Sequence, residues 1–241
     1  MSTPASIISS LYLAYYSRPA DPSGLRFWTQ RLEAQGNNNL DAIINAFATS
    51  PEAQARFGGL SINGFIDQVY QSLFARPAES GGLAYWSGLI QQGALTRGQA
   101  TLAILQGAQN GQAQDSALVN LRNDAALQFT QSLGSSGAYF GNAAADAATL
   151  LIASVQLGSS PSQINNLVLA ANQLVQMASA QPDAYNTLLG TGHHALGLLN
   201  TPAGRADPLG VIQTLGNILD TAVQEAGPNG NPSTALQRLL G

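Results

Sequence analysis

An all-α protein built from many short helices is the fold class that this sequence predicts. Apolar residues recur at the three- and four-residue spacing of amphipathic helices along most of the 241 residues. Proline, glycine and serine interrupt this pattern where helices are expected to end. No stretch shows the alternation of apolar and polar residues that is typical of a strand. We therefore expect a multi-helix bundle in which two related three-helix repeats are followed by further antiparallel helices.

The repeat is visible in one short motif. The stretch "SRPADPSGLRFW", residues 17–28, returns 58 positions later as "ARPAESGGLAYW", residues 75–86. Seven identical pairs support the alignment: Tyr12/Tyr70, Arg18/Arg76, Pro19/Pro77, Ala20/Ala78, Gly24/Gly82, Leu25/Leu83 and Trp28/Trp86. Self-similarity of this kind indicates a duplicated structural unit. We expect a duplicated region over residues 1–115, with one copy in 1–57 and the other in 58–115.

Each copy is expected to begin with an amphipathic helix that ends at the Arg-Pro pair, because proline disfavours the helical conformation of the residue before it. The apolar stripe occupies Ile8, Leu11, Tyr12, Tyr15 and Tyr16 in the first copy and Ile66, Val69, Tyr70, Leu73 and Phe74 in the second. A second helix starts at Asp21, which caps it, and Pro22, which opens it. Glu79 and Ser80 serve this role less well in the second copy.

The remaining helices follow from the same spacing. A third helix carries Leu40, Ile43, Ile44 and Phe47 in the first copy, and Leu102 and Leu105 in the second. Beyond the repeat, helices are predicted over residues 117–133, 142–157, 162–180, 182–189 and 208–226. We expect residues 116–226 to form a second helical bundle packed on the first. The stretch "GPNGNPS" then reads as a linker, so that residues 227–241 comprise a linker and a short terminal helix.

Composition excludes several classes of function. Only 9% of the residues are charged, the formal net charge is −4, and all nine basic residues are arginine, scattered singly. This distribution gives no basic surface for nucleic acid. The N-terminal residues show helical spacing rather than the continuous apolar core of a secretory signal, and no apolar run is long enough to span a membrane. We expect no nucleic-acid partner and no transmembrane segment.

The usual signatures of catalysis and metal binding are missing from the sequence. Cysteine is absent, and the only histidines, His193 and His194, are adjacent and would point in different directions on a helix. No nucleophile elbow, phosphate loop or cluster of aspartates occurs. We expect no metal, no cofactor and no catalytic residue. A glycosidase stays open at this point, because its two carboxylates can lie far apart in sequence.

Aromatic residues off the predicted core stripes are the candidate ligand contacts. Phe27 and Tyr85 sit beside Trp28 and Trp86 on another face of the predicted helix, and Tyr139 lies in a stretch rich in glycine and serine. Tyr15 and Tyr16 are not both expected to be fully buried, so Tyr16 joins the candidates. An exposed ring can stack on a sugar while amide side chains bond its hydroxyls. The aromatic stripes themselves are expected to form the core.

The repeated arginines allow two interpretations. Arg18 and Arg76 either tie the turn together, through helix-end carbonyls or the carboxylates of Asp21 and Glu79, or contact a sugar hydroxyl or an acidic sugar. We favour the first interpretation, and under the second both residues are candidate glycan contacts.

The motif also resembles a known family. The stretches "LYLAYYSRPADPSGLRFW" and "VYQSLFARPAESGGLAYW" are similar to the helical repeat of bacterial surface proteins exported by type I secretion, and the similarity covers residues 5–115. The layout of the whole chain resembles the N-terminal domain of RTX-type S-layer proteins. That resemblance implies an extracellular module that binds the O-polysaccharide of lipopolysaccharide and holds a lattice of copies on the outer membrane. It implies calcium only for a downstream RTX region, which this sequence does not contain.

Two function classes therefore follow from the sequence. The first is a non-enzymatic S-layer-like anchor at the bacterial cell surface that binds glycan. The alternative is a self-assembly or adhesion module of an RTX-type surface protein or sheath, in which apolar helix faces contact other copies.

Overall fold

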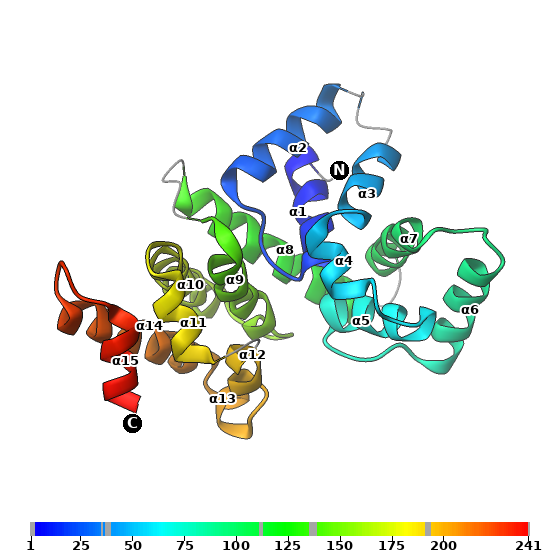
Figure 1. Cartoon of the computed structure of the whole chain (residues 1–241). Coiled ribbons are helices and arrows are strands. Elements are labelled where there is room, and N and C mark those ends of the chain that lie inside the picture. Colours follow the sequence, from blue (N-terminus) through cyan, green and yellow to red (C-terminus); the bar gives the residue numbers. More distant parts are fainter. Residues whose placement is uncertain are drawn as a thin grey trace. The chain divides into compact units, whose positions relative to one another are not determined.

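The structure is a computed structural model that describes residues 3–34, 36, 40–110, 113–134, 139–190 and 194–240. Within these residues the chain forms fifteen helices and no strand, which confirms the predicted all-α fold (Figure 1). The chain divides into two compact units, the N-terminal unit of residues 1–127 and the C-terminal unit of residues 128–241. The division falls inside one long helix, α8 (Ala113–Leu133).

The first copy of the repeat begins with the three predicted helices. These are α1 (Pro4–Tyr16), α2 (Pro22–Ala34) and α3 (Asp41–Ala48). A further short helix, α4 (Pro51–Phe57), follows and was not predicted. Its start uses the device seen at Asp21 and Pro22, because the Ser50 hydroxyl accepts a hydrogen bond from the Ala53 N–H at 3.1 Å and Pro51 opens the first turn.

The second copy contains α5 (Ile62–Phe74), α6 (Ser80–Gln91) and α7 (Arg97–Asn110). Glu79 precedes α6 without a side-chain cap bond, whereas Asp21 accepts from the Gly24 N–H at 2.7 Å. The weaker start predicted for α6 is therefore confirmed.

Both first helices end in the same unusual way. Ser17 and Ala75 are the only described non-glycine residues with positive φ, at 55° and 56°. Each donates its N–H back to the preceding turn, to the carbonyls of Leu13 and Gln71 respectively. A left-handed residue at this point ends the helix and turns the chain toward the Arg-Pro pair.

The C-terminal unit is built around α10 (Pro161–Ala180), which packs against three other helices, α9 (Gly141–Ser154), α11 (Pro182–Leu189) and α14 (Pro208–Ala226). The terminal helix α15 (Pro232–Leu240) packs on α14 and α11. Two short helices, α12 (His194–Leu199) and α13 (Pro202–Ala206), were not predicted. They are too short to show helical periodicity in the sequence.

The core of the N-terminal unit centres on an aromatic cluster. The Phe47 ring lies 5.1 to 5.7 Å from the rings of Tyr12, Tyr15, Tyr16 and Trp28. Tyr15 and Tyr16 are only 2% and 7% exposed, so the expectation that they could not both be buried was wrong. The tyrosines can be buried because their hydroxyls find partners: the Gly98 carbonyl for Tyr15 at 2.7 Å and the Ser50 hydroxyl for Tyr16 at 3.1 Å.

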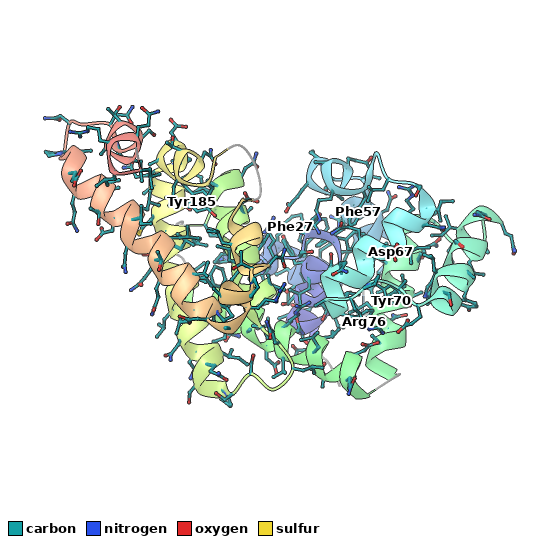
Figure 2. All side chains as sticks on the ribbon, turned by 90° about the horizontal axis from the view of Figure 1, so that it is seen from below. Phe27, Phe57, Asp67, Tyr70, Arg76 and Tyr185 are labelled. Atoms are coloured by element: carbon teal, nitrogen blue, oxygen red, sulfur yellow. The ribbon has the colours of Figure 1, made fainter. Side chains whose placement is uncertain are left out.

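Two fully buried tyrosines differ in hydrogen bonding and should respond differently to replacement by phenylalanine. Tyr15→Phe removes the partner of the Gly98 carbonyl, so we expect a loss of about 1 kcal/mol in the free energy of unfolding. The Tyr185 side chain lies in the C-terminal unit (Figure 2), and its hydroxyl has no hydrogen-bond partner among the described residues. Tyr185→Phe removes an unsatisfied polar group and should leave stability unchanged or raise it. Urea titration of both variants checks this, and an equal loss in both would contradict it.

Buried tyrosines also predict a loss of stability at alkaline pH. Burial raises the pKa of Tyr15, Tyr16 and Tyr185 above the ordinary value of 10.0. Their stabilisation is therefore fully present below about pH 10 and is lost as the pH rises further, because the unfolded chain releases those protons first. Burial lowers the pKa of Arg122 to about 10, which acts in the opposite sense. Three tyrosines lower the free energy of unfolding as the pH rises, and one arginine raises it. We therefore expect the urea midpoint to fall above about pH 10, together with a rise in tyrosinate absorbance.

Candidate functional site

The spacing that the two copies of the motif share reflects contacts inside each copy. A Cβ atom on Gly24 would lie 2.3 Å from the Tyr12 hydroxyl, and one on Gly82 would lie 2.9 Å from the Tyr70 hydroxyl. Glycine is therefore needed because the tyrosine hydroxyl occupies the space of a side chain. In the second copy the Trp86 indole also donates to the Tyr70 hydroxyl at 3.2 Å. These motif residues hold the turn and leave their polar groups engaged.

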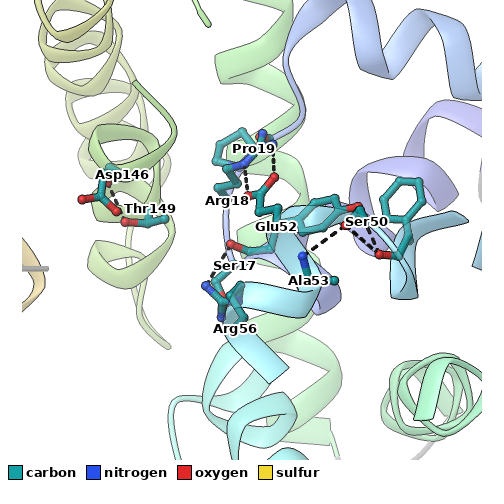
Figure 3. Close-up of polar contacts among 11 residues, drawn as sticks. Ser17, Arg18, Pro19, Ser50, Glu52, Ala53, Arg56, Asp146 and Thr149 are labelled. Carbon is teal, nitrogen blue, oxygen red and sulfur yellow. Dashed lines mark hydrogen bonds and ion pairs between the residues drawn. The ribbon is translucent and has the colours of Figure 1, made fainter. Parts of the chain in front are cut away.

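Arg18 and Arg76 are engaged in the same way. Arg18 donates to both carboxylate oxygens of Glu52 at 2.7 Å and to the Pro19 carbonyl (Figure 3). Its guanidinium also lies over the rings of Tyr12 and Tyr16. The carboxylate is Glu52 rather than the expected Asp21, because α4 brings Glu52 to the turn.

Arg76 pairs with Glu79, as expected, and with Asp115 at 2.7 Å. It also donates to the Pro77 carbonyl and lies over the ring of Tyr70 (Figure 2). The contacts of both arginines fit the interpretation that they tie the turn.

Three further arginines hold helix ends. Arg56 donates to the Tyr16 carbonyl, Arg97 to those of Phe57 and Leu60, and Arg122 to those of Ser72 and Leu73. A planar guanidinium carries five N–H donors and can reach two acceptors at once, which an ammonium on a flexible stem does less well. This gives a physical reason for the use of arginine in place of lysine.

Replacing Arg18 by lysine tests this reason. Arg18→Lys keeps the charge but loses the paired bonds to Glu52 and the flat contact with the two rings. We expect a loss of about 1.5 kcal/mol in the free energy of unfolding, measured by urea titration. Arg26→Lys is the matched control, because Arg26 is exposed, and its effect should stay within about 0.5 kcal/mol. Equal effects at both positions would argue against a structural role for the guanidinium.

Phe27 and Tyr85 are the candidates that do reach the surface. They occupy equivalent positions on α2 and α6 and are 54% and 60% exposed. Each ring meets its neighbouring tryptophan edge to face, with centroids 4.9 Å apart for Phe27 and Trp28 and 4.8 Å for Tyr85 and Trp86. The tryptophans pack against the core, so each exposed ring contacts a side chain that is itself held in place. The duplication thus presents two similar aromatic platforms.

The surroundings of the two platforms differ. On α2, the exposed residues Arg26, Gln30 and Arg31 flank Phe27. The positions flanking Tyr85 on α6 are occupied by Ala84, Gly88 and Leu89. Arg26 and Arg31 were not among the candidate contacts predicted from the sequence, because the scattered arginines indicated no basic surface. Helical spacing, which places both residues beside Phe27, is the signal that identifies them.

The other two aromatic candidates are buried. Tyr16 belongs to the aromatic cluster described above, and Tyr139 is 7% exposed with its ring 5.7 Å from that of Phe129. Neither offers a ring face to a ligand, so both leave the candidate set. The neighbouring Phe140, 67% exposed, is the aromatic residue of that stretch that reaches the surface.

A groove of about 370 Å³ lies in the C-terminal unit, between the end of α9 and the starts of α10 and α14. Its polar lining is largely used to cap helices. The Gln163 amide accepts from the Ser160 N–H, the Asp207 carboxylate accepts from the Gly210 N–H, and Arg205 donates to the Asn200 carbonyl. Asp207 is the one carboxylate among the lining residues, so the groove does not present a facing carboxylate pair.

The described residues offer neither a metal-ligand cluster nor a membrane-spanning helix. Within them, no three histidine, aspartate or glutamate side chains come close enough to share a metal ion. His193 lies outside the described residues, and His194 is the first residue of α12. No helix in the part of the chain that the structure covers is long and apolar enough to cross a membrane.

The comparisons with known proteins concern the duplicated region. Residues 3–57 and 44–113 each match the family model described as "Domain of unknown function (DUF4214)". The two matches correspond broadly to the two copies of the repeat and overlap over α4 and most of α3. The chain has no significant match among curated proteins or among solved structures.

Proposed function

We propose that this chain is a non-enzymatic anchoring module of an S-layer-like protein, outside the cell at the bacterial surface. In this proposal it binds the O-polysaccharide of lipopolysaccharide and holds a sheet of copies on the outer membrane. The observation that carries the proposal is the pair of exposed rings, Phe27 and Tyr85, at equivalent positions of a duplicated scaffold. The partner comes from the resemblance of the motif to the repeat of type I-secreted surface proteins.

The chemistry of the platforms suits a sugar polymer. An aromatic ring with one free face can stack on the apolar face of a pyranose, and this contact needs little charge. Binding at one such platform is weak. Two platforms per chain and many chains per sheet raise the effective concentration, so the assembly stays bound although each contact is released easily.

A second candidate function, self-assembly or adhesion, rests on a different observation. Two large apolar side chains of the C-terminal unit are exposed: Phe140, the residue before α9, is 67% exposed, and Leu169 on α10 is 61% exposed. Large apolar side chains at such exposure are suited to contacts with another protein copy. Phe140→Ala and Leu169→Ala should then lower the concentration-dependent association of the chain, measured by sedimentation velocity, and leave glycan binding unchanged.

Co-sedimentation with bacterial cells tests the anchoring proposal. The full chain is mixed with cells that carry intact O-polysaccharide and with matched cells that lack it. We expect retention only on the former, reduced at least tenfold when Phe27→Ala and Tyr85→Ala are combined, because stacking on each ring supplies on the order of 1 kcal/mol. Leu198→Ala is the control, since it removes an exposed apolar side chain, 44% exposed, that has no part in either candidate function. Equal retention on both cell types would refute glycan anchoring and leave self-assembly as the better candidate.

A further inference from the structure

One side of α2 carries two exposed arginines beside an exposed aromatic ring. We call it the α2 face and define it by Arg26, Phe27, Gln30 and Arg31, all exposed. With 3.6 residues per turn, Gln30 and Arg31 each lie about one turn after Phe27. Arg31 lies on one flank of the ring, and Gln30 and Arg26 lie on the other. The opposite side of α2 holds Leu25, Trp28 and the fully buried Leu32 against the core. The α2 face is therefore held in place but turned to solvent.

The two arginines of the α2 face are not used by the fold. Within the described residues neither Arg26 nor Arg31 makes an ion pair or a side-chain hydrogen bond. This sets them apart from Arg18 and Arg76, whose donors are engaged. The one acid on the exposed side of α2 is Glu33, nearly two turns from Arg26. The α2 face thus carries a net positive charge in a chain whose formal net charge is −4.

The second copy gives an internal comparison. The face of α6 around Tyr85 carries Ala84, Gly88 and Leu89 where α2 carries Arg26, Gln30 and Arg31. Tyr85 therefore has no charged side chain or amide at those flanking positions. The same scaffold presents one ring between cations and the other ring in neutral, apolar surroundings.

We propose that the α2 face binds an acidic sugar and that the α6 platform binds a neutral one. The ring of a uronic acid stacks on Phe27, its carboxylate accepts hydrogen bonds from Arg26 or Arg31, and the Gln30 amide bonds a hydroxyl. A planar guanidinium matches a planar carboxylate with two parallel N–H bonds, which favours a sugar carboxylate over a neutral hydroxyl. This inference rests on the proposed glycan-binding function and names the class of sugar that one of its two platforms selects.

Binding of the full chain to two soluble polysaccharides tests the proposal. Polygalacturonate supplies uronic acids and dextran supplies neutral sugars. We expect polygalacturonate to bind at least tenfold more tightly at low ionic strength, and the difference to shrink as salt is raised, because exposed charges are screened. Arg26→Gln combined with Arg31→Gln should remove about tenfold from polygalacturonate binding and leave dextran binding unchanged. Arg238→Gln is the control at an exposed arginine far along the sequence, and it should have no effect on either polymer.

A gain of function completes the test. Ala84→Arg combined with Leu89→Arg gives the α6 platform the charges of the α2 face and should raise polygalacturonate binding several-fold.

Equal binding of both polymers by the unmodified chain would overturn the inference while leaving O-polysaccharide anchoring intact. Binding of polygalacturonate without retention on O-polysaccharide-bearing cells would keep the inference and refute the anchor. Equally tight binding to anionic phospholipid vesicles, lost in the same arginine variants, would overturn the inference in favour of a membrane surface.

Discussion

Phe47→Ala is expected to destabilise the N-terminal unit by about 4 kcal/mol, the largest effect of any single replacement considered. Phe47 is 1% exposed, and its ring contacts three tyrosines of α1 and the tryptophan of α2. Truncation removes the apolar area of the ring and leaves a cavity that Tyr15 and Tyr16 cannot move to fill, because their hydroxyls are bonded to Gly98 and Ser50. The change therefore disconnects α1, α2 and α3 at one point.

Urea titration followed by circular dichroism measures this effect. Phe27→Ala is the matched control, since the same atoms are removed from a ring on the same unit that is 54% exposed. Its effect should stay within about 0.5 kcal/mol. A small loss for Phe47→Ala, or comparable losses for both variants, would mean that the aromatic cluster is not the centre of the N-terminal unit.

Gly24→Ala is expected to cost about 2 kcal/mol. The new methyl group would lie 2.3 Å from the Tyr12 hydroxyl and 2.6 Å from the Asp21 carboxylate. Tyr12 is buried in the aromatic cluster and Asp21 caps α2, so neither can move without losing another interaction. The strain falls on the turn that joins α1 to α2.

A graded series distinguishes this contact from helix propensity. Gly82→Ala should cost less than Gly24→Ala, because the nearest atom, the Tyr70 hydroxyl, lies 2.9 Å away. Gly88→Ala, inside α6 with no atom within 4 Å, should instead stabilise the protein by about 0.5–1 kcal/mol. Thermal unfolding of the three variants gives the order. The explanation fails if all three shift stability in the same direction.

The repeated motif combines two tasks at neighbouring positions. The tyrosine, the arginine, the glycine and the tryptophan of each copy contact one another or the core and hold the turn. Phe27 and Tyr85, one residue before each tryptophan, are turned outward. Since consecutive residues on a helix differ by about 100° in direction, a buried tryptophan places its predecessor on another face. Adjacent residues of one motif therefore provide a tryptophan that packs on the core and an exposed ring that can contact a ligand.

Local patterns in the sequence were sufficient for the fold class, the duplication and most helix bounds. Asp21 and Pro22 marked the start of α2, and the change to Glu79 and Ser80 correctly indicated a weaker start for α6. The helix at residues 182–189 was predicted to the residue. These features depend on neighbours within one turn, so the sequence contains them directly. α4 follows the same rule and was missed only because its serine cap was overlooked.

The roles of single side chains depended on contacts between residues far apart in the chain. Tyr16 is buried because α3 and α4 cover one side of α1, whereas Phe27 lies on the exposed face of α2 in the N-terminal unit. Arg18 is held by Glu52, 34 positions away, whereas Arg26 stays free for a ligand among the described residues. The sequence by itself determined the helices and the repeat, because hydrogen bonding and capping are local. Only the tertiary structure decided which rings and which cations reach solvent, because burial and pairing are set by packing between helices.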